Sequence, residues 1–345
     1  MRPEDFDYAL PPEAIARYPA PEREGARLLV LPKKDGPPAH RAIRDLPRFL
    51  RPGDLLVLND TRVMPWRLMG KRASGGKVEV LLIEREGGGV FRALVSANRP
   101  LPEGERILLL DGREAVLGPQ GRERRLAFAE PGGLEAWIGE RGETPIPPYL
   151  GRPAEPLDRE RYQTVYARVP GAAAAPTAGL HLSEGLLAEL EAAGVERAAL
   201  TLHVGPGTFR PVKAARVEDH EIEEEACCLP AGTARRIGET RERGGRVVAV
   251  GTTVVRTLEW AAMEAEREGG GALLREGAGR AALFIRPGHR FRIVDALLTN
   301  FHLPRSTLLM LVCAFAGRER VLAAYEAARE AGYRFYSYGD AMLIA

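Results

Sequence analysis

The chain has 345 residues, 45% of them hydrophobic and 28% charged, with a formal net charge of only +2. This composition excludes a disordered chain and a strongly basic nucleic-acid-binding domain, although a modest net charge still permits an RNA partner. No apolar run is long enough to cross a bilayer and residues 1–10 have no signal-peptide core, so we expect a soluble, cytoplasmic protein without a membrane partner.

The first 62 residues predict a short helix and two apolar strands. The helix is expected at residues 12–18 and the strands at residues 27–31 and 54–59. The second strand ends in the polar cluster Asn59-Asp60-Thr61-Arg62, which is a candidate for binding or catalysis at a strand terminus.

Residues 63–152 differ in pattern, because short alternating runs are separated by glycine-rich turns. The expected strands are residues 77–84, 90–97, 106–110, 114–117 and 124–128. This spacing is typical of a small all-β unit, a barrel or a sandwich. The proline-rich stretch Pro145-Ile146-Pro147-Pro148 predicts a stiff exit from it.

After Tyr162, helical and strand patterns alternate. Helices are expected at residues 183–193, 231–243, 254–268, 306–316 and 320–331. Strands are expected at residues 198–204, 246–250, 281–285 and 292–295. The sequence therefore predicts an α/β fold in which both chain ends, residues 1–62 and 153–345, build a large mixed α/β domain, and residues 63–152 form an inserted, barrel-like β-domain.

Four segments place glycine, threonine or histidine beside an apolar run. They are residues 175–182, 200–209, 247–259 and 297–310. Such strand ends expose backbone N–H and hydroxyl donors, often at the start of a helix. Any one of them is explained by an ordinary strand-to-helix turn, but four in one chain favour a site for a polar substrate rich in oxygen atoms.

Three of the six histidines, His181, His203 and His302, lie in these segments. Imidazole titrates near neutral pH, so each is a candidate for proton transfer. For any one of them, satisfying backbone groups at a strand edge is the better explanation, but for at least one of the three we favour catalysis. Neither the histidines nor the three cysteines show a metal-ligand spacing, and we expect no metal.

The sequence Gly251-Thr252-Thr253 follows a strand and opens a helix, so its amides can bind an anion, and Arg256 one turn later can add a fork. Simple threonine capping is the alternative. No G-x-G-x-x-G fingerprint is present, which argues against a dinucleotide-dependent oxidoreductase.

Two further features have less certain roles. Residues 218–225 gather carboxylates around His220 and are more typical of a solvated loop than of a metal site. Tyr338 and Asp340 lie in an aromatic cluster near the C-terminus that can stack a base or simply pack a terminal strand.

Together these motifs resemble the S-adenosylmethionine:tRNA ribosyltransferase-isomerase family nearly end to end. The matching stretches are residues 53–65 (GDLLVLNDTRVMP), 75–82, 162–166, 174–181 (AAPTAGLH), 201–211 (TLHVGPGTFRP), 249–259, 295–312 (DALLTNFHLPRSTLLMLV) and 333–344. One departure is Glu223, which stands where the family tends to have a second histidine after His220.

The resemblance implies transfer and isomerisation of the ribosyl part of S-adenosylmethionine onto 7-aminomethyl-7-deazaguanine at the tRNA wobble position. The product is epoxyqueuosine in tRNA, and adenine and methionine are released. It implies a monomer that consumes S-adenosylmethionine as a substrate, uses no cofactor or metal, and meets the anticodon loop of tRNA.

The hypothesis for the site follows from membership of the matched motifs. His181, His203 and His302 would transfer protons, and Asp60 would orient a base or face the sulfonium. The substrate-binding candidates are Thr177, Gly205, Thr208, Thr252, Thr253, Arg256, Asn300, Ser306, Tyr338 and Asp340. Phosphate contacts are expected at Arg62, Arg67, Lys71 and Arg72.

Two other function classes remain open from the residues alone. One is a small-molecule ribosyl- or nucleotide-binding transferase that needs no RNA. The other is a non-catalytic RNA-binding module, which accounts for the arginine content but not for histidine, threonine and asparagine at strand ends.

Overall fold

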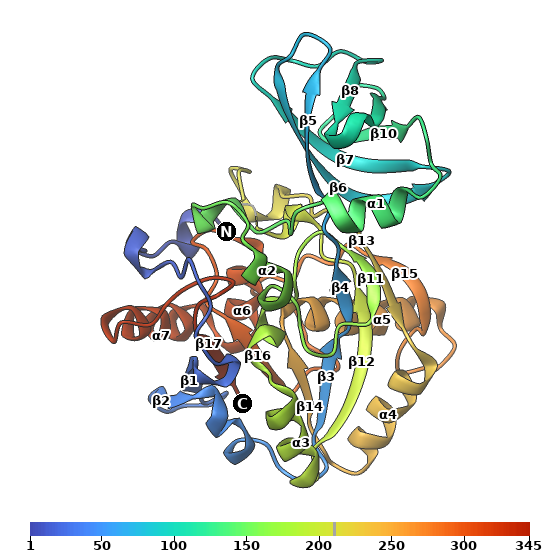
Figure 1. Ribbon diagram of the computed structural model, residues 1–345. Coiled ribbons are helices and arrows are strands. Elements are labelled where there is room, and N and C mark those ends of the chain that lie inside the picture. The colour runs from blue at the N-terminus through green and yellow to red at the C-terminus, as the bar shows by residue number, and fades with distance from the viewer. Residues whose placement is uncertain (210–211) are drawn as a thin grey trace.

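The computed structural model describes residues 1–209 and 212–345. It consists of a large α/β part and a small closed β-barrel that stands on it, at the top of Figure 1. The predicted fold class, a mixed α/β domain with a barrel-like β insert, is confirmed.

The large part is built on a sheet of nine strands in the order β15-β13-β12-β3-β14-β16-β17-β1-β2. In this order the strands are β15 (Gly277–Ala281), β13 (Glu225–Leu229), β12 (Glu196–Leu202), β3 (Leu55–Asn59), β14 (Val247–Val250), β16 (Ala296–Asn300), β17 (Ala341–Ile344), β1 (Arg27–Leu31) and β2 (Ala39–Ala42). The central strands β12, β3, β14 and β16 are parallel neighbours. Their carboxyl ends therefore meet at one edge of the sheet.

Alternation along the strands distributes apolar side chains to both faces of the sheet. On β3, Leu55 and Val57 join one core cluster and Leu56 and Leu58 join the other. The first face is covered by α4 (Ala231–Glu242), α5 (Thr252–Glu268), α6 (Thr307–Ala316) and α7 (Arg318–Glu330). The second face is covered by α3 (Glu184–Ala192) together with short 3₁₀ turns such as η4 (Ile43–Arg48) and η7 (Thr177–His181).

The barrel closes in the order β10-β7-β6-β5-β8-β9, and every pairing in it is antiparallel. Its strands are β5 (Arg67–Arg72), β6 (Lys77–Gly87), β7 (Val90–Ala97), β8 (Arg106–Leu109), β9 (Glu114–Leu117) and β10 (Arg124–Phe128), followed by helix α1 (Leu134–Arg141). A Cβ at Gly70 would lie 3.0 Å or less from Ile107, Leu108 and Leu109. Only glycine therefore permits β5 and β8 to approach so closely.

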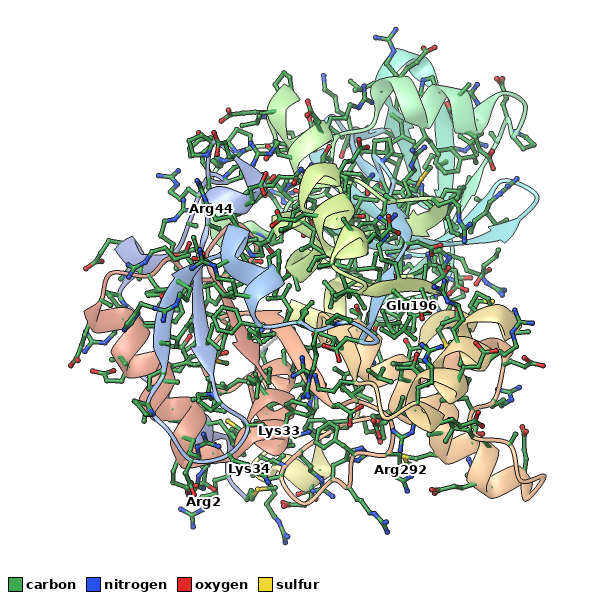
Figure 2. The ribbon with its side chains drawn as sticks, turned by 90° about the horizontal axis from the view of Figure 1, so that it is seen from below. Arg2, Lys33, Lys34, Arg44, Glu196 and Arg292 are labelled. Carbon is green, nitrogen blue, oxygen red and sulfur yellow. The ribbon has the colours of Figure 1, made fainter. Side chains whose placement is uncertain are left out.

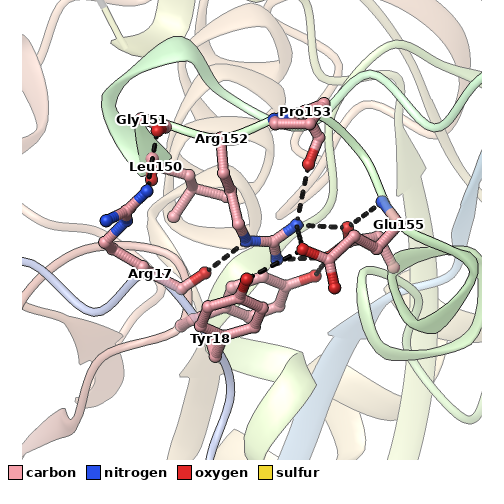
Figure 3. Close-up of polar contacts among 9 residues, drawn as sticks. Arg17, Tyr18, Leu150, Gly151, Arg152, Pro153 and Glu155 are labelled. Atoms are coloured by element: carbon pink, nitrogen blue, oxygen red, sulfur yellow. Dashed lines mark hydrogen bonds and ion pairs between the residues drawn. The ribbon is translucent and has the colours of Figure 1, made fainter.

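Two short strands carry the chain between the parts. The strand β4 (Thr61–Val63) leads from β3 toward the barrel and pairs in parallel with β11 (Val169–Ala172). The returning segment, with helix α2 (Pro156–Arg161), is fixed around Arg152, which donates to the backbone oxygen of Arg17 at 3.0 Å and lies 4.2 Å over the Tyr18 ring (Figure 3). These contacts attach the exit of the insert to the N-terminal segment.

Most predicted elements are present within one or two residues, but some differ, and the structure adds elements that were not predicted, among them β2, β5 and α1. The expected helix at residues 12–18 is only a 3₁₀ turn (Pro12–Ala14), because prolines surround it. The strand expected at 281–285 is wrong, since β15 ends at Ala281, and the strand expected at 292–295 precedes the actual strand β16. The strand β13 was not predicted, since its sequence Glu225-Ala226-Cys227-Cys228-Leu229 follows an acidic run.

Charged side chains are spread over the face of the α/β part that is turned away from the barrel (Figure 2). Arg292 pairs with Glu266 at 2.9 Å, and Glu196 pairs with Arg243 at 2.7 Å. The arginines that pair in this way are balanced by nearby acids rather than gathered into a basic patch. In the described part of the chain, no helix combines the length and the apolar character that a membrane span requires.

Candidate functional site

Polar residues gather where the parallel strands end. Asn59 ends β3, His203 directly follows β12, Thr252 follows β14 after one glycine, and Asn300 ends β16. The crevice outside the carboxyl ends of parallel strands is where α/β sheets usually bind ligands. Three of the four segments singled out in the sequence therefore lie along one edge, together with the polar cluster that follows β3.

Hydrogen bonds join these strand ends. The Asn59 amide donates to the Leu202 backbone oxygen at 3.0 Å and to the Thr253 Oγ1 at 3.2 Å. Its Oδ1 accepts from the amides of Thr61 and Leu202. A buried asparagine whose amide is used on both sides makes this edge rigid.

His203 is the only one of the three predicted histidines on the wall of a large cavity among the described residues. Its Nδ1 lies 2.8 Å from Thr61 Oγ1, so Nε2 is the nitrogen left for a substrate. A Cβ at Gly171 would come within 2.8 Å of the ring, so this glycine makes room for the imidazole. Burial lowers the pKa of His203, while the charges of Glu84 and Asp60 oppose that effect.

His181 and His302 are held differently, inside the protein. His181 Nε2 lies 3.2 Å from Asn300 Nδ2, and His302 Nε2 lies 2.8 Å from Thr299 Oγ1. Burial lowers the pKa of His302 to about 3, and burial with the charges of Arg334 and Arg23 lowers that of His181 to about 4. The expectation that these two imidazoles titrate near neutrality is therefore wrong, because their charged forms are not solvated.

Asp60 is buried and held from two sides. Its Oδ1 accepts from Thr201 Oγ1 at 2.6 Å, and its Oδ2 pairs with Arg168 at 2.8 Å. It bonds no histidine directly, but its charge acts on His203. This carboxylate can tune the histidine, whereas Thr61 is the group that orients it.

The large cavity lies between the barrel and the sheet edge and has a volume of about 760 Å³. This volume is in the range of cavities that hold small-molecule ligands. The barrel contributes the aromatic side chains Trp66 and Phe91, and the α/β part contributes Gly171, His203 and Gly205. The acidic residues on its walls are Glu84, Glu123, Glu135, Glu223, Glu224 and Glu225.

Ion pairs cross this cavity from one part to the other. Arg280 on β15 contacts Glu84 on β6 at 3.1 Å, and Arg122 contacts Glu223 at 2.5 Å. Arg280 also reaches Glu224 at 3.1 Å. The barrel is thus joined to the sheet by half-exposed charges at the mouth of the cavity.

The expected role of Arg256 as a substrate fork is not supported by its surroundings. Its guanidinium is 3% exposed and pairs with the buried carboxylate of Glu225, which also accepts from the Gly205 amide at 2.9 Å. Sequence reasoning could not find this partner, because Glu225 stands at the end of an acidic run that is typical of a solvated loop. Arg256 and Glu225 instead form a buried ion pair, which we call the floor: Glu225 lines the large cavity, and both residues line a second cavity of about 530 Å³.

Two smaller cavities lie along the sheet edge, each of about 20 Å³. Thr177, Asn300 and His302 line both of them, and Thr252 and Thr253 line one. The structure thus brings these five predicted residues together.

Ser306, which lines one of these cavities, caps helix α6. Its Oγ accepts from the Leu309 amide at 3.2 Å and donates to the Leu303 oxygen at 2.7 Å. Its hydroxyl proton is therefore used within the fold and is not left to donate to a ligand.

Tyr338 and Asp340 support the fold rather than face a cavity of ligand size. The Tyr338 hydroxyl donates to Asp158 at 2.7 Å, within the cluster around Arg152. The Asp340 carboxylate accepts from the amides of Arg27 and Arg334, each at 2.8 Å. The side chain of Thr208 lies outside the described part of the structure.

The four residues expected to meet RNA phosphates fall into two pairs. Arg67 is joined to Glu79 at 2.8 Å and Arg72 to Glu105 at 3.1 Å, so neither is a free cation. Arg62 and Lys71 are exposed. These two remain candidates for contact with a polyanion.

Among the described residues, no group of three or more His, Cys, Asp or Glu side chains is arranged to hold a metal ion. The residues that sequence reasoning missed are those of the barrel wall, Trp66, Glu84 and Phe91, together with Arg280. An alternating strand pattern shows only that a side chain points inward or outward. It does not show that the outer wall of a barrel faces a second domain.

The fold and the cavity define a two-domain α/β protein with a nucleoside-sized space between a parallel-sheet edge and a small barrel. The chain belongs to the queuosine biosynthesis protein family, whose family model matches residues 3–344.

Its relatives match over the whole chain. A protein of Anaeromyxobacter sp. (strain Fw109-5) named S-adenosylmethionine:tRNA ribosyltransferase-isomerase is 55% identical, covering 100% of this chain and 99% of the relative. A protein of the same name from Pelobacter propionicus is 53% identical, with 100% of both covered. The crystal structure of S-adenosylmethionine tRNA ribosyltransferase from Thermotoga maritima is 38% identical with a TM-score of 0.56, covering 99% of this chain and 100% of that one.

Proposed function

We propose that this protein is an S-adenosylmethionine:tRNA ribosyltransferase-isomerase. It transfers the ribosyl part of S-adenosylmethionine to 7-aminomethyl-7-deazaguanine at the wobble position of tRNA, isomerises it, and releases adenine and methionine. The full-length identity of 50–55% to relatives with that name supports the activity. S-adenosylmethionine is consumed as a substrate, without a resident cofactor, by a monomer acting in the cytoplasm.

The observation that carries the location of the chemistry is the cavity of about 760 Å³ with His203 on its wall. Abstraction of a proton beside a sulfonium needs a base, and His203 offers Nε2 while Thr61 holds Nδ1 at 2.8 Å. A lowered pKa keeps this imidazole neutral, which is the form that accepts a proton. We therefore assign the base to His203 rather than to His181 or His302.

The walls of the cavity suit a cationic nucleoside. The sulfonium carries a positive charge, and the amine of the tRNA base also tends to be protonated, so carboxylates such as Glu84 and Glu224 favour both groups. Trp66 and Phe91 provide apolar faces for adenine and for cation–π contact with the sulfonium.

The anticodon loop must bring its wobble base into the same cavity, with the base turned out of the stack. The cavity lies between the two parts, so the RNA would approach along the line where the barrel meets the sheet. Arg62 and Lys71 are the predicted residues still available to its phosphates.

The test is a single-turnover assay with labelled S-adenosylmethionine and tRNA carrying the 7-aminomethyl-7-deazaguanine base. We expect adenine release coupled to ribosyl transfer, and a loss of about 10²–10⁴-fold in H203A. The matched control is H40A, because His40 is exposed on the edge strand β2 and bonds Tyr333 there.

Two outcomes would contradict the proposal. Transfer to the free base as fast as to tRNA would identify a small-molecule transferase. Intact S-adenosylmethionine after incubation with the substrate tRNA would identify an RNA-binding protein without this chemistry. A normal rate in H203A would refute the assignment of the base alone.

A further inference from the structure

The amino end of helix α5 is buried without a cap. The helix has 17 residues, its N-cap is Gly251, and no side chain accepts from its first turn. The first amides of a helix have no intrahelical partner, and among the described residues nothing accepts from the amides of Thr252, Thr253 or Val254. Thr252 and Thr253 are each 5% exposed, so bulk water does not fully replace the missing partners.

Asn300 adds an unsatisfied acceptor at the same place. It is 2% exposed and its Oδ1 has no partner among the described residues. Its Nδ2 is committed to the Tyr336 backbone oxygen at 3.0 Å and to His181 Nε2 at 3.2 Å. Turning the amide over would set two oxygens against each other, so the orientation is fixed and Oδ1 is left bare.

One cavity joins the two features. It is lined by Gly251, Thr252 and Thr253 from the helix and by Asn300 from β16, and Asn300 also lines its neighbour. A buried donor and a buried acceptor without partners each cost free energy, so a site with both suits a ligand that supplies the complements. That ligand has an anionic acceptor for the helix amides and a donor for Asn300.

Size and charge narrow the ligand further. Each cavity has about 20 Å³, which is too small for a purine ring, so the pair that shares Asn300 admits one small polar group in each. Their lining residues include no Asp, Glu, Lys or Arg. The amides at a helix start bind any small anion, but a carboxylate accompanied by an ammonium has no net charge and therefore suits a site without basic side chains best.

We propose that this is the subsite for the amino-acid end of S-adenosylmethionine, with the α-carboxylate on the amides at the start of α5 and the α-ammonium on Asn300 Oδ1. Val204 lines this cavity, and its neighbours His203 and Gly205 line the large one. The two spaces therefore lie on either side of one short segment, and the adenosyl part extends toward the large cavity. This inference rests on the proposed function, since it assumes that S-adenosylmethionine is the substrate.

The experiment measures the dissociation constants of S-adenosylmethionine, of its decarboxylated analogue, of the analogue without the α-amino group, and of 5′-methylthioadenosine. In the wild type, loss of either group is expected to weaken binding about 10- to 100-fold, as for charge-assisted hydrogen bonds. Equal affinity for all four compounds would overturn the inference.

Two variants then separate the two ends of the subsite. Proline is tolerated at the first helical position, and the ψ of 154° at Gly251 suits a residue that precedes proline. T252P removes one amide and should reduce the preference for the carboxylate about 3- to 10-fold, while the preference for the amino group stays. T252V keeps the amide and should behave as the wild type toward the carboxylate.

The complementary variant is N300L, with N300A as the second choice if the larger side chain does not fold. Either should abolish the preference for the amino group and keep that for the carboxylate. A matched control is R318P, since α7 is also capped by a glycine, Gly317, with φ 88° and ψ 132°. It should leave every preference unchanged.

The outcomes separate this inference from the proposed function. A wild type that neither binds nor consumes S-adenosylmethionine refutes the function. A wild type that consumes it, but whose T252P and N300L variants weaken 5′-methylthioadenosine as much as S-adenosylmethionine, refutes only the subsite and places the nucleoside there instead.

Discussion

The floor and the mouth of the large cavity hold their charges in opposite ways. On the floor, Arg256 and Glu225 are 3% and 7% exposed and face each other inside the protein. At the mouth, Arg280 and Glu84 are 38% and 34% exposed and join the sheet to the barrel. The same kind of ion pair, arginine with glutamate, is therefore fixed on the floor and exchangeable at the mouth, because water and salt screen only the pair at the mouth.

This difference fits the work proposed for the cavity. A floor that must orient a small substrate benefits from groups that cannot move. A mouth that must admit an RNA loop benefits from ion pairs that phosphates and solvent can replace at little cost. Two experiments test whether the two kinds of pair differ as much as their burial indicates, and a third measures the protonation of His203, which lines the same cavity.

The largest effect is expected from removing one partner on the floor. R256A removes the buried guanidinium that faces Glu225, and we expect a loss of about 3–5 kcal/mol in the free energy of unfolding, measured with urea. The control is R267A on the same helix, whose pair with Glu264 is exposed. It should change stability by less than about 0.5 kcal/mol.

Replacing both floor residues by leucine distinguishes a buried-charge penalty from lost packing. The double variant removes both charges, so it should recover part of the loss seen in R256A. If R256A and R267A had the same small effect, the floor pair would be no more fixed than a surface pair.

The second-largest effect is expected on the pH dependence of the rate, through His203 on the wall of the large cavity. Burial lowers its pKa, so the neutral base persists to a lower pH than an ordinary histidine near 6.5 allows. The single-turnover rate should thus be flat near neutral pH. It should fall about tenfold per pH unit only at pH values below the ordinary histidine pKa of about 6.5. A pH–rate profile at saturating substrate measures this.

The charge of Glu84 raises the pKa of His203 and so opposes the effect of burial. E84Q should therefore move the acid limb of the profile to still lower pH. An acid limb that lies above 6.5, or that moves upward in E84Q, would show that another group is the base.

Sequence reasoning succeeded where a residue's role depends on its neighbours in the chain. The strand ends that gather Thr252, Asn300 and His302 were predicted because glycine, threonine and histidine follow apolar runs, and the structure places them on one edge. The alternation between residues 90 and 97 likewise predicted strand β7 with its correct bounds.

Sequence reasoning failed where a residue's role depends on a partner from another element of the fold. Nothing near Arg256 in the sequence indicates that Glu225 neutralises it, and nothing near Asp340 indicates that the amides of Arg27 and Arg334 use its oxygens. For the same reason the titration of His302 could not be predicted, since burial by side chains from other elements lowers its pKa to about 3.

The smallest effect is expected at the mouth, where Arg280 meets Glu84. A double-mutant cycle with R280Q and E84Q should give a coupling free energy of at most about 1 kcal/mol at low salt. The coupling should vanish near 1 M salt, where the Debye length falls to roughly 3 Å.

The control is the pair of Arg92 and Glu84, which is similarly exposed but lies within the barrel. Because Arg280 bridges the two parts and Arg92 does not, R280Q and not R92Q should increase protease cleavage near the strands that join them. A coupling that survives high salt would mean that the mouth is as fixed as the floor, and an RNA loop would then have to enter by another route.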